Sequence, residues 1–435
     1  MSTTRDQATM EHPSLLDDIV LHENDLTEKA KSCFGYHSKI LHAFELYRRS
    51  ILSNEHMTST GKHGALAGVG KMHTNCKRVL NYMAEHNELL NGTLPPLGPL
   101  IICGLPRTGS TLLQNLLACD PDCRSPLFTD MCVEIVPPIS RSNAVEQKRR
   151  MAALQSSMQQ DTSFVTQRNQ IIASHPVFPI EEDYHILRQA SFLPFFTMIT
   201  SDPVSDDDTW LLEELNKDFA YDYHEVFLRM LNSVDAPRSH WVLKAPVHCF
   251  KQDTILQHYP NAAIIVTHRC LDEVLPSLCS TAWSLGSIYL DKRDAASRNT
   301  IKKQTLQFID KAVECMVEFR TRLDRMHDQK RKNLFDVAYN DLMEQPIATV
   351  RRIYDYFGLR WSDEFEGAMQ AWLSNNPQGK QGRHSYSLVD CELTHEDIET
   401  RYADYINLFQ CSSATDIAST NSNQLSSNNE SFQQV

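Results

Sequence analysis

Apolar residues near the start of the chain recur every three or four positions, which is the spacing of one buried face of an α-helix. Two segments, YHSKILHAFELYRRSIL and CKRVLNYMAEHNELL, show this spacing, so residues 14–92 are predicted to be helical. The glycine-containing stretch TGKHGALAGVG between them is expected to interrupt the helices. The prolines of NGTLPPLGP then restrict the backbone and end any helix. This break predicts a boundary between an N-terminal helical segment, residues 1–93, and a domain over residues 94–410.

From Leu100 onward, short apolar runs are each followed by a helical pattern. The four pairs are LIICG before STLLQNLLAC, HWVLK before FKQDTILQHY, AAIIVTHR before LDEVLPSLCSTA, and LFDVAYND before ATVRRIYDYFGL. Strands that alternate with helices predict a parallel sheet flanked by helices, and continuous apolar runs predict strands buried on both faces. An apolar stripe from Ile301 to Met326 predicts one further helix of about 26 residues.

Two segments depart from this alternation. Residues 162–237 are rich in aromatic and acidic side chains, as in HPVFPIEEDYHILRQASFLPFF and SDPVSDDDTW. We interpret them as a helical or irregular insertion over the sheet that shapes a binding pocket, with a surface excursion as the alternative. Residues 411–435 are rich in serine, asparagine and glutamine, and this composition predicts a disordered tail.

Composition narrows the class of protein. The 435 residues are 41% hydrophobic, and 42 basic against 55 acidic side chains give a formal charge of −13. This charge argues against a general binder of nucleic acids or anionic membranes. The twelve cysteines show neither a CxxC pair nor zinc spacing, so free thiols in the reducing cytoplasm are expected. Neither a signal peptide nor a membrane span is predicted from the apolar runs.

The stretch GLPRTGSTLLQNLL has the form of a phosphate loop between a strand and a helix. Gly104 and Gly109 stand five residues apart, and such a turn lets backbone N–H groups surround an anion at the positive end of a helix. Arg107 lies inside the loop, where its planar guanidinium can hold two oxygens at once. Ser110 and Thr111 add hydroxyl donors at the helix start. The expected fold is therefore α/β, with a P-loop-type parallel sheet.

The loop lacks two features of enzymes that use ATP or GTP. Ser110 occupies the position after Gly109, where those loops carry the lysine that reaches the terminal phosphates. The strand AAIIV ends in Thr267, His268 and Arg269 rather than in an aspartate that could organise magnesium. A basic strand end instead favours a second anion site. A tight turn without a ligand is the alternative for the loop alone.

These residues carry a resemblance to a known family. The loop resembles the 5′-phosphosulfate-binding loop of the sulfotransferases that use 3′-phosphoadenosine 5′-phosphosulfate (PAPS), in the arginine form typical of the tyrosylprotein branch and of a large microbial and invertebrate branch. THRCLDEVLPSLCS is similar to the family's 3′-phosphate motif, with the pair Arg269 and Ser277 eight residues apart. The resemblance implies that PAPS is bound by Arg107, Thr108, Gly109, Ser110, Thr111, Arg269 and Ser277.

Four further segments extend the resemblance over residues 76–409, and the first of them is NYMAEHNELL, just before the loop. WVLKAPVH places Lys244 where the family has a lysine that reaches the reacting group. VAYNDLMEQP places Tyr339 where related enzymes have a tyrosine near the adenine, although Asn340 replaces the usual glutamate. NPQGKQGRHSYSLVD resembles a loop that closes over the 3′-phosphate, which implies the binding residues Lys380, Gly382 and Arg383.

The resemblance implies in-line transfer of a sulfuryl group to a hydroxyl or amine of a small-molecule acceptor, with no metal required. Lys244 and Arg107 would stabilise the charge on the reacting groups. Two residues compete as the base that takes the acceptor proton, and neither is a third possibility. Asp130 lies where the related branch usually has glutamate, and His248 follows Lys244 by four residues rather than the two of the cytosolic branch. Glu181 and Glu182 are expected to line the acceptor pocket or to be solvated.

Two other functions stay open at this stage. One is a P-loop small-molecule kinase, which the missing loop lysine disfavours. The other is a non-catalytic scaffold that binds PAPS or its product 3′-phosphoadenosine 5′-phosphate (PAP). The sequence identifies neither the acceptor nor the oligomeric state.

Overall fold

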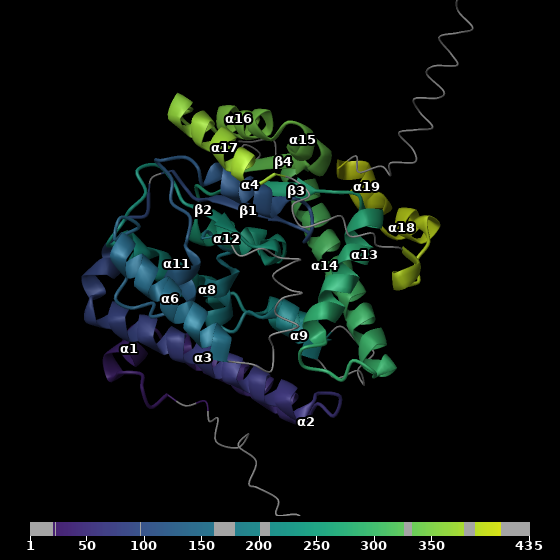
Figure 1. Cartoon of the computed structure of the whole chain (residues 1–435), viewed down its shortest axis with the longest axis horizontal. Coiled ribbons are helices and arrows are strands. Elements are labelled where there is room, and N and C mark those ends of the chain that lie inside the picture. The colour runs from purple at the N-terminus through teal and green to yellow at the C-terminus, as the bar shows by residue number, and fades with distance from the viewer. Residues whose placement is uncertain are drawn as a thin grey trace, which may run out of the picture.

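The computed structural model describes residues 21, 23–95, 97–160, 179–200, 209–325, 333–377 and 388–409. Its fold is α/β, as predicted, with a parallel sheet between layers of helices (Figure 1). The four strands of the described chain are β1 (Leu100–Gly104), β2 (Val242–Lys244), β3 (Ala263–His268) and β4 (Leu334–Ala338). Their order across the sheet is β2-β1-β3-β4, and every pair is parallel. Each strand falls within one of the predicted apolar runs.

Side chains of β1 and β3 are buried on both faces of the sheet. Because neighbouring residues of a strand point to opposite faces, each strand contributes to two cores. Ile101 and Cys103 pack into the larger core, while Leu100 and Ile102 pack into a smaller one. The smaller core lies between the sheet and the helices drawn above it in Figure 1. Burial on both faces explains why the strands are continuously apolar.

The N-terminal helices share the larger core with the sheet. They are α1 (Glu28–Cys33), α2 (His37–Ser53), α3 (Ser59–Glu85) and the 3₁₀ turn η1 (Asn87–Asn91). The predicted interruption at TGKHGALAGVG is wrong, because α3 runs through it without a break. Gly61 has a packing role there: a Cβ at this position would lie 2.1 Å from the carbonyl oxygen of Tyr289. The predicted break at the prolines is confirmed.

The middle of the chain is mostly helical. Its described elements are α4 (Ser110–Leu117), α5 (Phe128–Cys132), α6 (Ala144–Gln160), α8 (Tyr184–Gln189), α9 (Pro194–Thr200), α10 (Thr209–Leu215) and α11 (Phe219–Asn232). The last four belong to the predicted insertion, of which residues 161–178 and 201–208 lie outside the described chain. Helices α8 and α11 pack together and contribute to the larger core.

The remaining helices follow the strands. They are η3 (Pro246–Phe250), α12 (Gln252–His258), α13 (Leu271–Gly286), α14 (Ala295–Arg325), α15 (Tyr339–Glu344), α16 (Pro346–Phe357), α17 (Asp363–Asn375), η5 (Leu388–Cys391), α18 (His395–Arg401) and α19 (Ala403–Phe409). The predicted long helix is confirmed as α14, which begins six residues before Ile301. The tail that was predicted to be disordered lies outside the described residues.

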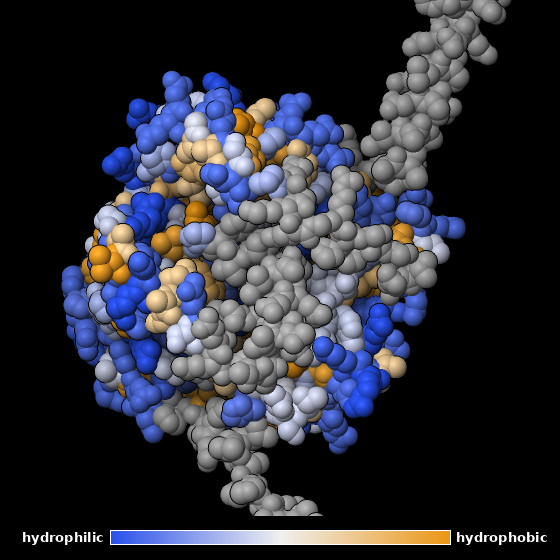
Figure 2. Space-filling view, in the orientation of Figure 1, coloured by the Kyte–Doolittle hydropathy of each residue, from blue (hydrophilic) through white to orange (hydrophobic). Residues whose placement is uncertain are grey.

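The described chain shows no large apolar patch on the face in Figure 2 and no reactive thiol among those whose pKa is raised. On the face in Figure 2, hydrophobic residues form small separate spots among hydrophilic ones. No described helix combines the length and the apolar character that a bilayer crossing needs. The eleven described cysteines are free, and burial raises the pKa of thiols such as Cys103 and Cys132 to about 12. Such thiols stay protonated at neutral pH and are poor nucleophiles.

Candidate active site

The phosphate-type loop begins where β1 ends. Gly104 has φ 131°, and a Cβ there would lie 2.5 Å from the carbonyl oxygen of Thr267 on β3, so glycine lets the two strand ends approach. Arg107 and Gly109 also have positive φ, 72° and 85°. Gly109 caps α4 without a side-chain hydrogen bond. Among the described residues, the backbone N–H groups of Thr108, Gly109 and Ser110 donate to no other protein group. This is the concave set of free donors that anions bind.

The two arginines predicted to bind opposite ends of one ligand lie next to each other. The Nε of Arg107 donates to Oγ of Ser277 on α13, at 3.1 Å. The Nη1 of Arg269 donates to the backbone carbonyl oxygen of Arg107, at 3.0 Å. Hydrogen bonds therefore join Arg107 to two residues that lie 162 and 170 positions further along the chain. The loop and the end of β3 thus bring two arginines to one place.

Tyr339 lies at the same place, at the start of α15. The Cζ atom of Arg269 lies 4.0 Å from the centre of the Tyr339 ring, which is the geometry of a cation–π contact. A Cβ on Gly109 would lie 3.2 Å from the Tyr339 ring, so the loop also packs against it. The same guanidinium is paired with Glu273, one turn along α13. The structure thus brings together Arg107, Gly109, Arg269, Ser277 and Tyr339. That they bind a nucleotide stays a prediction.

Lys244 is the last residue of β2, the edge strand next to β1. Its side chain is 2% exposed. The Nζ atom donates to Oγ1 of Thr111, at 3.2 Å, in the first turn of α4. It also forms an ion pair with Glu182, whose side chain is 14% exposed. Lys244 therefore connects the phosphate-type loop to an acidic group that is open to solvent.

Glu182 comes from the PIEED stretch of the predicted insertion. Two contacts fix that stretch beside the loop. The side-chain amide of Gln114 on α4 donates to the carbonyl oxygen of Glu181, at 3.1 Å. The Oδ1 atom of Asp183 accepts a hydrogen bond from the backbone N–H of Lys244, at 2.9 Å. A carboxylate thereby lies against a cation at the end of the sheet, where ligands of α/β folds bind.

His248, the first candidate base, is completely buried. Its Nδ1 lies 2.7 Å from the hydroxyl of Tyr221, and its Nε2 lies 2.9 Å from Oδ2 of Asp183. Burial opposes ionisation of Asp183, but His248 and His224 outweigh that effect and hold the pKa of its carboxyl well below the usual value. Both nitrogens of His248 are therefore engaged in the protein interior. An acceptor proton could reach neither nitrogen without breaking one of these bonds.

Asp130, the second candidate base, is also buried, with 2% of its surface exposed. Its Oδ2 caps α5 by accepting from the backbone N–H of Leu127, at 3.0 Å, and lies 3.7 Å from Nη2 of Arg124. Burial raises the pKa of this carboxyl. These partners belong to its own segment, and none is part of the loop. The roles of Asp130 and His248 as bases stay predictions that the geometry does not favour.

Three predicted site residues are not described by the structure, and two acidic residues beside Lys244 were not predicted to take part in the reaction. Lys380, Gly382 and Arg383 fall outside the described residues. Glu182 is predicted from the sequence to line the acceptor pocket or to be solvated, and the sequence predicts no role for Asp183. Three consecutive acidic residues are a weak signal, because exposed loops often carry them. Only their contacts with β2 distinguish them from a solvated run.

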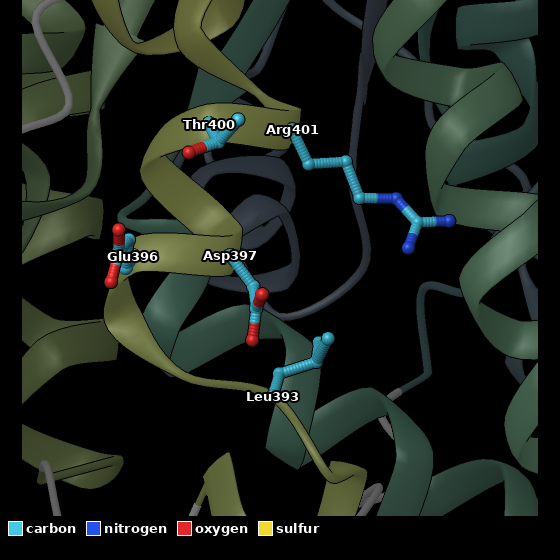
Figure 3. A pocket seen from close by; sticks show the side chains of 5 residues that line it. All are labelled: Leu393, Glu396, Asp397, Thr400 and Arg401. Carbon is cyan, nitrogen blue, oxygen red and sulfur yellow. The ribbon is translucent and has the colours of Figure 1, made fainter.

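A hollow lies beside α18. Figure 3 shows the side chains that line it, which are Leu393, Glu396, Asp397, Thr400 and Arg401. The guanidinium of Arg401 is paired with Asp310 of α14. Arg401 is neutralised by Asp310, and the other charged residues of the hollow are acidic. The hollow therefore does not suit an anionic ligand.

Comparisons with known proteins agree with this geometry. Residues 99–363 match the sequence model of the Sulfotransferase family. The crystal structure of sulfotransferase STF9 from Mycobacterium avium is similar, with a TM-score of 0.73 and 24% identity over 91% of this chain and 98% of that one. Sulfotransferase STF1 from Mycobacterium tuberculosis H37Rv has a TM-score of 0.66 and 22% identity over 89% and 96%. These two likenesses concern the fold. No curated protein matches the sequence.

Proposed function

The chain belongs to the sulfotransferase family, and from that premise we propose that it transfers a sulfuryl group from PAPS to a hydroxyl or amine of a small-molecule acceptor. The observation that supports this most is the contact between the phosphate-type loop and the end of β3. There, Arg269 donates to the carbonyl of Arg107, and Arg107 donates to Ser277. A ligand with a phosphosulfate and a separate phosphate would meet cations and hydroxyls on both sides of this contact.

The donor set suits PAPS as co-substrate. The free N–H groups of the loop, Arg107 and Thr111 would hold the 5′-phosphosulfate, because they surround the start of α4. Arg269 and Ser277 would hold the 3′-phosphate, which would compete with Glu273 for the guanidinium. Tyr339 would lie against the nucleotide on the other side of Arg269. Lys380, Gly382 and Arg383 keep their predicted role in closing over the 3′-phosphate.

Lys244 would act on the leaving group. Its ammonium is held at the start of α4 by Thr111, beside the loop that would bind the phosphosulfate. As the bond from sulfur to the bridging oxygen breaks, negative charge grows on the 5′-phosphate of the leaving PAP. A buried ammonium stabilises that charge more strongly than one in water would. Lys244 would then exchange its contact with Glu182 for one with that phosphate.

We assign the acceptor proton to Glu182 rather than to Asp130 or His248. Its carboxylate is partly exposed and in contact with Lys244, whereas Asp130 and His248 are both buried. The oxygen or nitrogen of the acceptor forms a bond to sulfur, its proton passes to Glu182, and the bonding electrons of the bridging oxygen leave with PAP. General-base assistance of this kind contributes roughly 10²–10⁴-fold to a rate. In cells, the reaction is proposed to take place in the cytoplasm.

The wild-type chain tests this function in two steps. Thermal unfolding is followed with PAP, with ATP and magnesium, with NAD and with coenzyme A. Selective stabilisation by PAP is expected, because a ligand that binds only the folded state raises the melting temperature by mass action. Transfer from ³⁵S-labelled PAPS to a panel of phenols, alcohols and amines then shows catalysis. Selective stabilisation by ATP and magnesium would support a kinase. PAP binding without any transfer would support the scaffold.

A further inference from the structure

The outer edge of β2 is covered by the main chain at Arg124, whose carbonyl accepts the N–H of Val242 at 2.8 Å, and at Lys244 by a side chain. In a parallel ladder, successive N–H groups of a strand point alternately to its two sides. The N–H of Ala245 points to β1 and donates to Ile102, at 3.3 Å. The N–H of Lys244 therefore points the other way, and β2 is the edge strand of the described sheet. Oδ1 of Asp183 accepts this N–H at 2.9 Å. The carboxylate of Asp183 thus occupies the place that a further strand would take.

The carboxylate of Asp183 is itself held by two histidines from different elements. Its Oδ2 lies 2.9 Å from Nε2 of His224 on α11 and 2.9 Å from Nε2 of His248 on η3. The Nδ1 atoms of these rings lie 2.7 Å from the hydroxyls of Tyr259 and Tyr221. With each tyrosine hydroxyl donating to Nδ1, each ring donates from Nε2. All these polar groups are then satisfied around one buried negative charge.

This arrangement determines where the Lys244–Glu182 pair lies. Asp183 holds the main chain of Lys244 directly, and it is joined by a peptide bond to Glu182. Both members of the pair are therefore placed by the same fixed carboxylate. A buried and fully hydrogen-bonded group has little freedom to move, so the pair is held close to one geometry.

We propose that Asp183 is a positioning residue, which sets the Lys244 ammonium and the Glu182 carboxylate against the reacting groups without touching the substrate. The inference rests on the proposed function of that pair. Its structural part, the fixing of the Lys244 main chain, can also be measured without any activity. A carboxylate that served only to stabilise the fold would lower the melting temperature and leave the turnover of the folded enzyme unchanged.

The experiment compares Asp183→Ala with Asp183→Asn in the full-length chain. The alanine variant removes the acceptor for the N–H of Lys244. The asparagine variant keeps an amide oxygen that can accept it, and its NH2 can donate to both Nε2 atoms once the histidine protons move to Nδ1. We expect kcat to fall about tenfold or more in Asp183→Ala, with the KM for PAPS within about twofold of wild type, and to recover most of its value in Asp183→Asn. Hydrogen exchange at the Lys244 amide should accelerate in the alanine variant and stay near the wild-type rate in the asparagine variant.

The matched control is Glu23→Ala, because Glu23 is the carboxylate partner of another buried histidine, His37, at 3.3 Å. It should lower the melting temperature without changing kcat. If Asp183→Ala does not fold, His224→Leu and His224→Gln repeat the comparison, since glutamine keeps an N–H donor toward Asp183 and leucine removes it. The leucine variant should have the lower kcat.

Three outcomes would overturn the proposal. The first is a folded Asp183→Ala, or His224→Leu in its place, with wild-type kcat. The second is a loss of kcat that is equal in the asparagine and alanine variants. The third is an unchanged exchange rate at Lys244. The failure of the proposed function would look different: the wild-type chain would transfer no label, while the exchange measurements would still show whether Asp183 fixes Lys244.

Discussion

Arg269 donates a hydrogen bond from Nη1 to the backbone carbonyl oxygen of Arg107, with the two atoms 3.0 Å apart. The carbonyl belongs to a residue with φ 72°, a conformation that costs a non-glycine residue about 1 kcal/mol or more. The hydrogen bond therefore helps to hold the loop in an unfavourable shape. It also connects the two expected phosphate positions. A substitution at the end of β3 should therefore also change the shape of the loop.

The first prediction concerns this arginine. Arg269→Lys keeps the charge but loses the planar fork and the contact with Tyr339. We expect PAP to bind about 10–100-fold more weakly, which corresponds to about 1.4–2.8 kcal/mol. Isothermal titration calorimetry with PAP measures the change. Arg293→Lys is the control, because Arg293 is an exposed arginine paired with Asp291. Equal affinities for PAP in Arg269→Lys and the wild type would show that Arg269 does not hold the nucleotide.

The second prediction separates catalysis from nucleotide binding. Lys244→Ala and Glu182→Gln should each lower kcat by roughly 10²–10⁴-fold, since both groups act on charge or protons that move in the reaction. PAP should still bind, because Arg107, Arg269 and Ser277 are unchanged. Turnover of labelled PAPS and calorimetry with PAP report the two quantities.

Lys251→Ala is the matched control for Lys244→Ala. Lys251 is also a buried lysine, and its Nζ lies 2.7 Å from Oδ1 of Asp218. Its loss should reduce stability without a comparable loss of kcat. If the Glu182→Gln enzyme keeps the wild-type kcat, Glu182 is not the base, and Asp130 or His248 becomes the candidate again.

The third prediction concerns the contact of α3 with the end of α13. Gly61→Ala would push a methyl group against the carbonyl oxygen of Tyr289 and should reduce the free energy of unfolding by about 1–3 kcal/mol. Gly68 is the control on the same helix, because a Cβ there meets no atom within 4 Å. Gly68→Ala should increase stability by about 0.5–1 kcal/mol, since alanine favours a helix over glycine. Denaturant unfolding of both variants measures the change in the free energy of unfolding. A Gly61→Ala variant more stable than the wild type would contradict the packing.

The fourth prediction concerns stability in acid. Burial lowers the pKa of His240 to about 4, whereas an unfolded histidine titrates near about 6.5. The unfolded state therefore binds more protons below about pH 6.5, and the folded state loses stability as the pH falls toward 4. The contribution of this residue is about 3 kcal/mol over that interval.

The pH dependence of unfolding in His240→Phe tests this assignment. The variant should lose less stability than the wild type between pH 7 and pH 4. His395→Gln, at an exposed histidine, should follow the wild-type curve. Parallel curves for His240→Phe and the wild type would mean that His240 takes up no extra proton on unfolding.

Local sequence patterns predicted most of the sheet. The four apolar runs become β1 to β4 because strands buried on both faces need apolar residues at successive positions. The loop was also predicted from the sequence, because Gly104 and Gly109 permit the positive φ angles that other residues avoid. Helix α3 shows where such reasoning failed. Its glycines predicted an interruption, yet burial of the apolar face that includes Ala65, Leu66 and Val69 outweighs their weak helix propensity.

The sequence by itself determined the fold class, the loop and the cations beside it, since each depends on residues within one strand, turn or helix. Tertiary structure alone decided which acidic group meets Lys244. His248, four residues from that lysine, is turned into the interior, while Glu182, 62 residues away, contacts its ammonium. The physical reason is that β2 leaves an N–H open at the edge of the sheet, and Asp183 satisfies it, bringing its neighbour Glu182 to the site. No periodicity or spacing along the chain records which segment will cover an open strand edge.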